Sequence, residues 1–174
     1  MLTIESLDAG RARALLPALA GLLRDSVEAG ASIGFMLPLP EEAVEAYWRK
    51  VIDDLPDGRV LLLARLDGRV VGAAQLALER RQNGAHRAEV QKVLVHTSAR
   101  RRGVGRALMD ALEREARARG RTLLVLDTRA DDPAERLYLA AGYTLAGRIP
   151  GYARSPDGTL DDTTIFYRRL SVED

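Results

Sequence analysis

The sequence predicts a mixed α/β fold in which helices cover both faces of one central β-sheet. Aliphatic runs typical of strands alternate with amphipathic runs typical of helices, in the order β-α-α-β-β-β-α-β-α-β-β. The chain has 174 residues, which is close to the size of one domain, and no repeat or low-complexity segment divides it. We therefore expect residues 1–174 to form a single α/β domain.

The chain begins with a strand and a long helix. A strand is predicted over residues 1–7, and Asp8 after it has the side chain of a typical N-cap. Residues 9–28 carry leucines at helical spacing, which predicts a helix that packs against the core, with Pro17 as a local irregularity.

A second helix and a β-hairpin follow. Pro40 suits the first position of a helix over residues 41–55, in which acidic residues come early and basic residues later, as the helix dipole favours. Two β-rich runs, at 59–66 and 69–79, are separated by Asp67-Gly68. This dipeptide is a strong indication of a tight hairpin turn.

The middle of the chain reads as strand, helix and strand. The predicted elements are a strand at 88–96, a helix at 104–119 that ends before Gly120, and a fully apolar strand at 122–128. A further helix at 132–142 and two strands, at 143–153 and 163–170, complete the fold.

Composition and charge exclude several classes of function. The formal net charge is +1, so the chain as a whole does not attract nucleic acid. The longest apolar runs are shorter than the ~18 residues that a membrane span needs, and the N-terminus has no features of a secretory signal. Because the chain has no cysteine, it forms no acyl-cysteine intermediate and no thiolate zinc site. We expect a cytoplasmic protein that contacts neither membrane nor nucleic acid and binds no metal.

The stretch ARRRGVGRA, at residues 99–107, points to anion binding. It lies between a predicted strand and a predicted helix, and a helix N-terminus has unpaired N–H groups that attract anions. Gly103 and Gly105 would let the backbone approach a bulky ligand, while Arg100, Arg101, Arg102 and Arg106 add positive charge. The junction is therefore predicted to hold a phosphate or pyrophosphate, although such glycines often serve only the turn.

Two other phosphate-binding motifs fit less well. A Rossmann site would use Asp127 as its ribose-binding acid, but Leu108 stands where the third small residue of the glycine motif belongs. A P-loop is excluded because no Gly-Lys-Ser or Gly-Lys-Thr follows the glycines.

RRRGVGRAL at 100–108 resembles the acetyl-CoA signature of the GCN5-related N-acetyltransferase (GNAT) superfamily. DDPAERLYLAAGY at 131–143 resembles its second signature, except that Asp131 replaces the usual asparagine. Several further stretches, among them GRIPGYA and PDGT, are similar to the tabtoxin-resistance acetyltransferases within this superfamily.

The resemblance implies the acyl-CoA N-acyltransferase fold, with acetyl-CoA as co-substrate and no metal. It implies that the diphosphate rests on the glycine loop, and that the pantetheine pairs with a strand that splays away from the apolar strand at 122–128. The residues predicted to contact acetyl-CoA are Val93, Leu94, Val95, Arg100, Arg101, Arg102, Gly103, Val104, Gly105, Arg106, Ala107 and Asp131.

The resemblance also implies an acid-base pair. Asp127 would help to deprotonate the acceptor amine, and Tyr138 would protonate the departing thiolate. Other readings stay open: Asp127 could only orient the following loop, and Glu89 or a water-linked group could be the base. By the alternation of strand residues, we expect Glu89 and Gln91 to share a face with Val93 and Val95.

The acceptor is expected to be the primary amine of a small molecule, such as an amino-acid-like toxin or antibiotic, acetylated by direct transfer in a ternary complex. The segments 30–40 and 150–162 would form the walls of its site. Phe35, Met36 and Leu37 would supply apolar surface, and Asp161 and Asp162 would attract a cationic amine. The alternatives are a protein N-terminus as acceptor and a non-catalytic sensor of acetyl-CoA. The resemblance leaves room for a homodimer.

Overall fold

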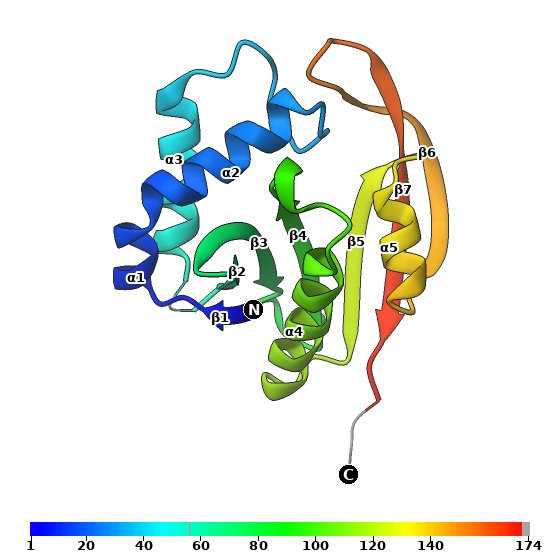
Figure 1. Cartoon of the computed structure of the whole chain (residues 1–174). Helices are drawn as coiled ribbons and strands as arrows, with labels where there is room; N and C mark the ends of the chain where they lie inside the picture. The colour runs from blue at the N-terminus through cyan, green and yellow to red at the C-terminus, as the bar shows by residue number, and fades with distance from the viewer. Residues whose placement is uncertain (56, 172–174) are drawn as a thin grey trace.

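A computed structural model describes residues 1–55 and 57–171; Pro56 and residues 172–174 of the predicted domain lie outside the described residues. The strands form one seven-stranded sheet in the order β1-β2-β3-β4-β5-β7-β6 (Figure 1). All pairs are antiparallel except β4 with β5. The strands are β1 (Leu2–Ser6), β2 (Arg59–Leu66), β3 (Arg69–Leu78), β4 (Arg87–Val95), β5 (Leu123–Arg129), β6 (Thr144–Arg154) and β7 (Leu160–Arg169).

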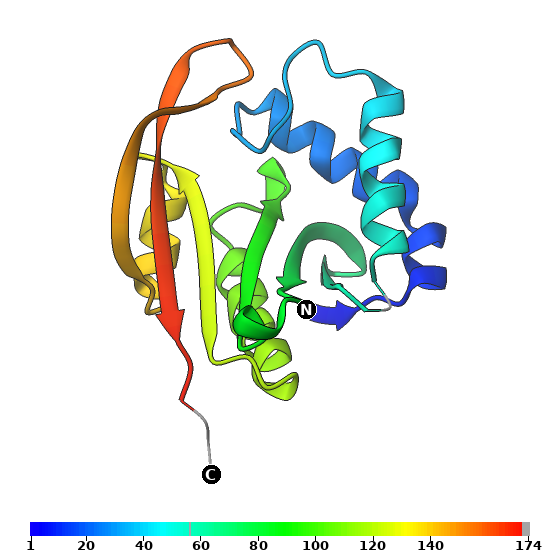
Figure 2. The ribbon, with the colours of Figure 1, turned by 180° about the vertical axis from the view of Figure 1, so that it is seen from behind.

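The helices are α1 (Ala9–Ala14), α2 (Leu16–Glu28), α3 (Glu41–Asp53), α4 (Val104–Ala118) and α5 (Ala134–Ala140), with short 3₁₀ turns η1 (Gln82–Gly84) and η2 (Thr97–Ala99). The expected mixed sheet with helices on both faces is confirmed. Figure 1 shows α4 and α5 in front of the sheet, and Figure 2, from behind, shows the strands in front of these two helices.

The predicted continuous helix over residues 9–28 is wrong, because the chain breaks at Leu15 into α1 and α2. Pro17 lies in the first turn of α2. Proline has no N–H to donate to the carbonyl four residues earlier, and its ring clashes with that carbonyl, so the two segments cannot continue as one helix. The predicted cap is confirmed: the Asp8 carboxylate accepts a hydrogen bond of 2.8 Å from the Arg11 N–H. Pro40, expected inside α3, instead caps it.

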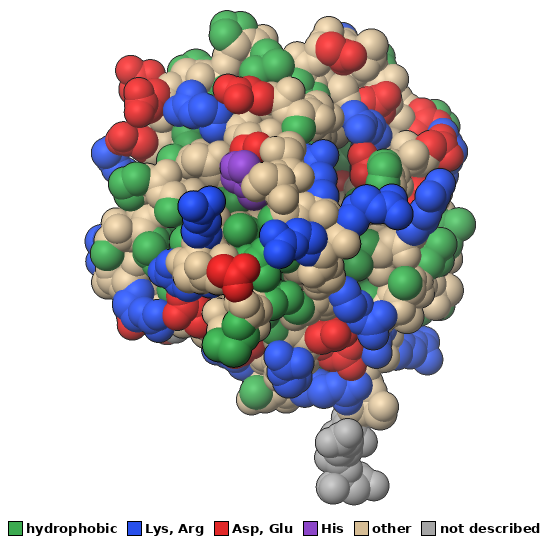
Figure 3. Space-filling model, viewed as in Figure 1, with side chains coloured by type: hydrophobic (Ala, Val, Ile, Leu, Met, Phe, Trp, Pro, Cys, Tyr) green, Lys and Arg blue, Asp and Glu red, His purple; other side chains and the backbone are tan. Residues whose placement is uncertain are grey.

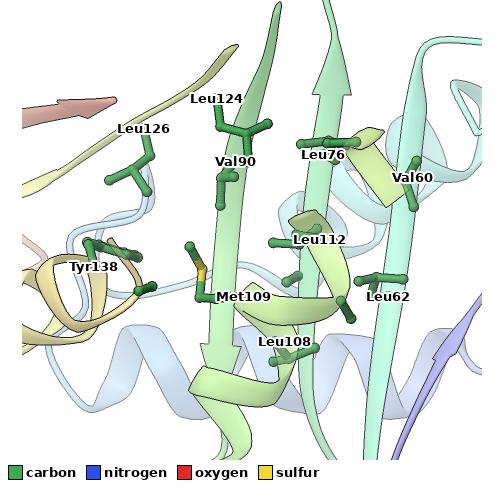
Figure 4. Packing of buried hydrophobic residues seen from close by; sticks show 14 of the residues in the cluster. Val60, Leu62, Leu76, Val90, Leu108, Met109, Leu112, Leu124, Leu126 and Tyr138 are labelled. Atoms are coloured by element: carbon green, nitrogen blue, oxygen red, sulfur yellow. The ribbon is translucent and has the colours of Figure 1, made fainter. Parts of the chain in front are cut away.

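Strand alternation gives the protein two apolar layers. In β2, Val60, Leu62 and Ala64 belong to the cluster under α4 and α5, whereas Leu61 and Leu63 belong to the cluster under α1, α2 and α3. Figure 4 shows the first cluster, where α4 lays Leu108, Met109 and Leu112 against the sheet. Both faces of the central strands are therefore buried.

The parallel pairing of β4 with β5 is short. It covers only Arg87, Ala88 and Glu89 on β4, paired with Leu123, Leu124 and Val125 on β5. The rest of each strand continues without this pairing, and the ribbons separate toward their C-terminal ends (Figures 1 and 2). The expected splay of these two strands is confirmed.

The predicted hairpin of β2 and β3 is also confirmed. Asp67 and Gly68, between β2 and β3, both have positive φ, of 51° and 81°, as a two-residue type I′ turn requires. The hairpin of β6 and β7 forms the other end of the sheet, with β6 at the edge. Among the helices of the described residues, none has the length and apolar character that crossing a membrane requires.

Candidate active site

The glycine loop leads from β4 into α4. Arg101 has a φ of 59° and Gly103, the N-cap of α4, a φ of 78°. The Ala107 N–H bonds to the Gly103 carbonyl, so the N–H groups just before it have no partner inside the helix. Nothing lies within 4 Å of the position that a Gly103 side chain would take. This loop has the open backbone that a diphosphate needs.

Positive charge surrounds the loop. Arg100, Arg101 and Arg102 are exposed. Basic side chains gather across the middle of the face in Figure 3, over the part of the molecule where β4 leads into α4. Arg106 differs from the others, because its side chain bonds to Asp110 at 2.8 Å and to the Ala140 carbonyl at 2.7 Å. Its guanidinium therefore joins α4 to the end of α5.

Gly105 has a packing role that the sequence did not reveal. A Cβ atom at Gly105 would lie 3.0 Å from a methyl group of Leu137 on α5 and 3.8 Å from Val95. Its missing side chain thus allows α5 to approach the first turn of α4. A substitution at Gly105 disturbs this contact as well as any ligand on the loop.

Helix α2 holds the start of the loop. The Asp25 carboxylate accepts hydrogen bonds from the Thr97 N–H, at 2.8 Å, and from the Thr97 hydroxyl, at 2.7 Å. The His96 ring caps η2 by accepting from the Ser98 N–H at 3.2 Å. Asp25 thus helps to position the loop, and sequence reasoning missed it because nothing in the local pattern of α2 indicates a partner 72 residues away.

Asp131, predicted near the pantetheine, lies on the connection between β5 and α5 with a φ of 63°. Its carboxylate is 3.0 Å from the Arg148 guanidinium on β6. Aspartate is one of the few residues that adopt positive φ readily, so the departure from asparagine keeps the backbone of this turn. The side chain itself points to an arginine.

A cleft of about 190 Å³ opens where β4 and β5 separate. Polar groups line it together with apolar side chains from β5 and β7; the lining residues are Glu89, Val125, Leu126, Asp127, Tyr152, Thr163 and Ile165. Tyr152 on β6 is 58% exposed and stands at the rim. The cleft thus brings together Asp127, the predicted base, and Glu89, the predicted reserve base.

The Asp127 side chain points away from α4 and α5. Its neighbour Leu126 belongs to the cluster under those helices, so alternation directs Asp127 to the other face of the sheet. Desolvation by the surrounding protein raises the pKa of Asp127, and the negative charge of Glu89 raises it further. Lys92 opposes this shift. A carboxyl group with a raised pKa is a better base when ionised, as a proton acceptor in the cleft must be.

Tyr138 approaches from the opposite face. It reaches from α5 toward Met109 and Leu126 (Figure 4), is only 7% exposed, and packs with its ring centre 6.1 Å from that of Phe166. Burial, and then the negative charges of Asp132 and Asp127, raise the pKa of Tyr138 far above that of an ordinary tyrosine. Tyr138 is therefore a core residue and a proton-bearing group at the same time.

A bulge in β4 overturns the predicted arrangement of its side chains. Gln75 of β3 pairs with Gln91 but Ala73 pairs with Leu94, so β4 has one extra residue opposite Ala74. After the bulge, Val93 and Val95 pack under α4. They therefore lie on the same face of the sheet as Ala88 and Val90, which precede the bulge. Glu89 and Gln91 therefore do not share a face with Val93 and Val95. Lys92, with a φ of 49°, lies at this bulge, which no sequence pattern predicted.

Arg129 joins the two segments that are predicted to form the walls of the acceptor site. Its guanidinium donates to the Gly30 carbonyl at 3.0 Å, to Ser155 at 3.2 Å and to Asp132 at 2.8 Å. These contacts tie the loop after α2 and the hairpin of β6 and β7 to the end of β5. Phe35 of the same loop packs edge-on against Tyr47 of α3. The two predicted walls are thus held in place by side chains that come from the sheet and α3.

Asp161 and Asp162 do not offer the free negative charge expected of them. Asp161 accepts a hydrogen bond from Ser155 and lies 4.0 Å from Arg129. Asp162 accepts from Arg148 at 2.8 Å and from the Gly151 N–H at 2.8 Å. Each carboxylate thus has an arginine partner, Arg129 of β5 or Arg148 of β6, so the negative charge available to an amine in the cleft comes from Glu89 and Asp127.

Within residues 1–55 and 57–171, no cluster of three or more His, Cys, Asp or Glu side chains is arranged to hold a metal ion. The parts of the chain that fit a coenzyme are instead the open loop at Gly103, the exposed arginines before it, and the stretch of β4 beyond Glu89 that does not pair with β5.

Comparison with known proteins places this geometry in a family. An uncharacterized N-acetyltransferase of Azospirillum brasilense is 41% identical over 107 residues, which cover 60% of this chain and 62% of that protein. The ribosomal-protein-alanine N-acetyltransferase of Brucella melitensis has a TM-score of 0.80 at 27% identity, covering 97% of this chain and 99% of that one. The yncA protein of Salmonella typhimurium, solved with its cofactor acetyl-CoA, has a TM-score of 0.81 at 23% identity, with coverage of 100% and 96%. Residues 30–143 match the acetyltransferase (GNAT) family, and the chain belongs to that family.

Proposed function

We propose that this protein transfers the acetyl group of acetyl-CoA to the primary amine of a small molecule, directly and within a ternary complex. One observation carries the proposal: β4 and β5 part beyond Glu89, next to an open glycine loop on one side and an acidic cleft on the other. A thioester between the parted strands would be open to Asp127 from one face and to Tyr138 from the other.

The loop residues would hold the coenzyme. The unpaired N–H groups at the start of α4 and the arginines at 100–102 suit the diphosphate. The free edge of β4 at Val93, Leu94 and Val95 suits the pantetheine, which pairs like an added strand. The Asp131 side chain lies against Arg148, so we assign the turn backbone, rather than this carboxylate, to any contact there.

The chemistry follows from the two titratable groups. Bound acetyl-CoA supplies a thioester as the electrophile. Asp127 in its ionised form accepts a proton from the acceptor ammonium, which cannot attack while protonated. The raised pKa of Tyr138 keeps its hydroxyl protonated, so that a donor is always present for the developing thiolate. A backbone N–H of the Val93–Val95 stretch would stabilise the oxyanion. With no cysteine in the chain, direct transfer is the simplest route.

An amine acceptor is favoured by the two carboxylates in the cleft, Glu89 and Asp127. The likeness of several sequence stretches to the tabtoxin-resistance acetyltransferases supports an amino-acid-like toxin or antibiotic as the acceptor. A protein N-terminus is the second candidate, because the Brucella melitensis protein at 27% identity is a ribosomal-protein-alanine N-acetyltransferase. The homodimer and the cytoplasmic location stay predictions of the sequence.

A panel assay tests the proposal. Thiol release from acetyl-CoA is measured with small primary amines, amino acids and a short peptide with a free N-terminal alanine. We expect turnover with a small amine and little with the peptide. Turnover with the peptide alone would favour the second candidate, and binding of acetyl-CoA without turnover on any amine would indicate a sensor.

A further inference from the structure

Lys92 is unusual in this chain. The sequence has 24 arginines but only two lysines, Lys50 and Lys92. Arginine keeps its proton under all ordinary conditions, whereas lysine can lose it and become a nucleophile. One of the two lysines lies on α3, and the other lies on β4, three residues beyond Glu89, which lines the cleft.

The fold places Lys92 on the parted stretch of β4. The last pair of β4 with β5 is Glu89 with Val125, three residues before Lys92. The bulge at Lys92 is followed at once by Val93, Leu94 and Val95, the stretch that suits the pantetheine. Lys92 therefore stands where the acetyl end of a coenzyme on this strand would lie.

The side chain of Lys92 lies near the carboxylates of the cleft. Asp127 and Glu89 act on it through their charges and not through a hydrogen bond, so the amine is not tied to either group. Arg59 of β2 is the third charge that acts on it. Partial burial lowers the pKa of Lys92, and the charge of Arg59 lowers it further, against the pull of the two carboxylates. Lys92 therefore loses its proton to form the neutral amine more readily than an exposed lysine does.

We propose that Lys92 is a self-acetylation site: when no acceptor amine is present, its amine takes the acetyl group from acetyl-CoA bound in the same site. The inference rests on the proposed function. It adds a modification that changes the acceptor side, because acetylation removes the Lys92 charge that acts on Asp127 and Glu89.

The reaction balances as an ordinary acetyl transfer. The Lys92 ammonium first gives one proton to Asp127, from which it passes to solvent. The Lys92 nitrogen then forms a bond to the carbonyl carbon, and the carbon–sulfur bond breaks. The nitrogen then loses its second proton to solvent, while Tyr138, the proposed acid, protonates the departing thiolate and regains a proton from solvent. The product is an amide, which does not return its acetyl group to an amine, so the modified protein is a dead end and not an intermediate of transfer.

Mass spectrometry of the full chain tests this inference with an internal control. The protein is incubated with acetyl-CoA and no amine, then cleaved at arginine, which isolates Lys92 in residues 88–100 and Lys50 in residues 50–59. Because a positioned amine reacts much faster than a free one, we expect Lys92 to gain an acetyl group at least about ten times faster than Lys50. Tyr138→Phe should slow the modification of Lys92 only, and Lys92→Arg should abolish it.

Calorimetry with acetyl-CoA on the same sample distinguishes failure of this inference from failure of the proposed function. If acetyl-CoA binds and Lys92 stays unmodified, or reacts no faster than Lys50, the inference is wrong and the proposed function stands. If acetyl-CoA does not bind, both are overturned.

Discussion

Glu89 and Val125 form the last parallel pair between β4 and β5, and beyond this pair the two strands separate. Glu89 and Asp127, two residues past Val125, then face the same cleft. The cleft thus begins where the backbone hydrogen bonds between β4 and β5 end. Asp127 and Tyr138 lie on opposite faces of the sheet, so the proposed site needs the gap after this pair for both to reach one ligand.

Two substitutions at Tyr138 distinguish its proposed chemical role from its packing role. Tyr138→Phe keeps the ring contacts with Tyr143 and Phe166 and removes only the hydroxyl, so we expect kcat to fall by about 10²- to 10⁴-fold with little change in stability. Tyr138→Ala should cost about 3–5 kcal/mol of unfolding free energy, since it empties a core position. Steady-state kinetics and denaturant unfolding measure the two effects. Full activity in Tyr138→Phe would leave Tyr138 as a core residue alone.

If Asp127 is the base, its protonation should cause the loss of activity at low pH, the acid limb of the pH–rate profile. As a base it works only when ionised, and its pKa is raised by desolvation and by Glu89. Activity should therefore be lost, as the pH falls, at a higher pH than for an ordinary aspartate. Asp127→Asn should lower kcat by about 10²- to 10⁴-fold and remove this limb, while acetyl-CoA affinity stays the same. If the variant keeps its activity and the limb, Glu89 or a bound water is the base.

Gly105 tests the contact between α4 and α5. Gly105→Val should lower the unfolding free energy by about 1–3 kcal/mol, because its side chain meets Leu137, and should also weaken acetyl-CoA binding. Adding Leu137→Ala should restore part of the stability but not the affinity. Gly21→Val is the matched control, since Gly21 is also helical and nothing lies within 4 Å of its added Cβ. Recovery of affinity together with stability would show that Gly105 serves packing only.

Arg129 should govern the acceptor and not the coenzyme. Arg129→Met breaks the contacts to Gly30, Ser155 and Asp132, so the two walls lose their common anchor. We expect kcat/KM for the amine to fall about tenfold or more, which corresponds to about 1.4 kcal/mol, with acetyl-CoA affinity unchanged. Arg136→Met, on the exposed side of α5, is the control. Equal losses for the amine and the coenzyme would point to general unfolding.

Much of the fold could be predicted from the sequence, because local chemistry decides those features. Asp8 caps α1, Asp67-Gly68 forms a tight turn, and the alternation of β2 assigns its side chains to two faces. The break at Leu15 was missed because the leucine pattern continues across it, although Pro17 prevents one continuous helix.

The site was predicted less fully, because its geometry depends on tertiary contacts. One extra residue in β4 moves Val93 and Val95 to the face opposite Glu89, and a bulge leaves no mark in a hydrophobic pattern. The sequence pattern suggests that Asp161 and Asp162 are free acids, yet Arg129 and Arg148, on the two strands that flank β7 in the sheet, pair with them. The glycine motif predicted an open loop, which the structure has at Gly103, but the approach of Leu137 to Gly105 could not be predicted from it.

Hydrogen–deuterium exchange with and without acetyl-CoA tests the central claim most directly, namely that the coenzyme lies along the parted edge of β4 and on the loop before α4. The claim predicts slower exchange in peptides that cover residues 90–95 and 100–107, and no change in α1 or on β6. Unchanged exchange in both peptides at a saturating concentration of acetyl-CoA, or protection confined to β6, would contradict it.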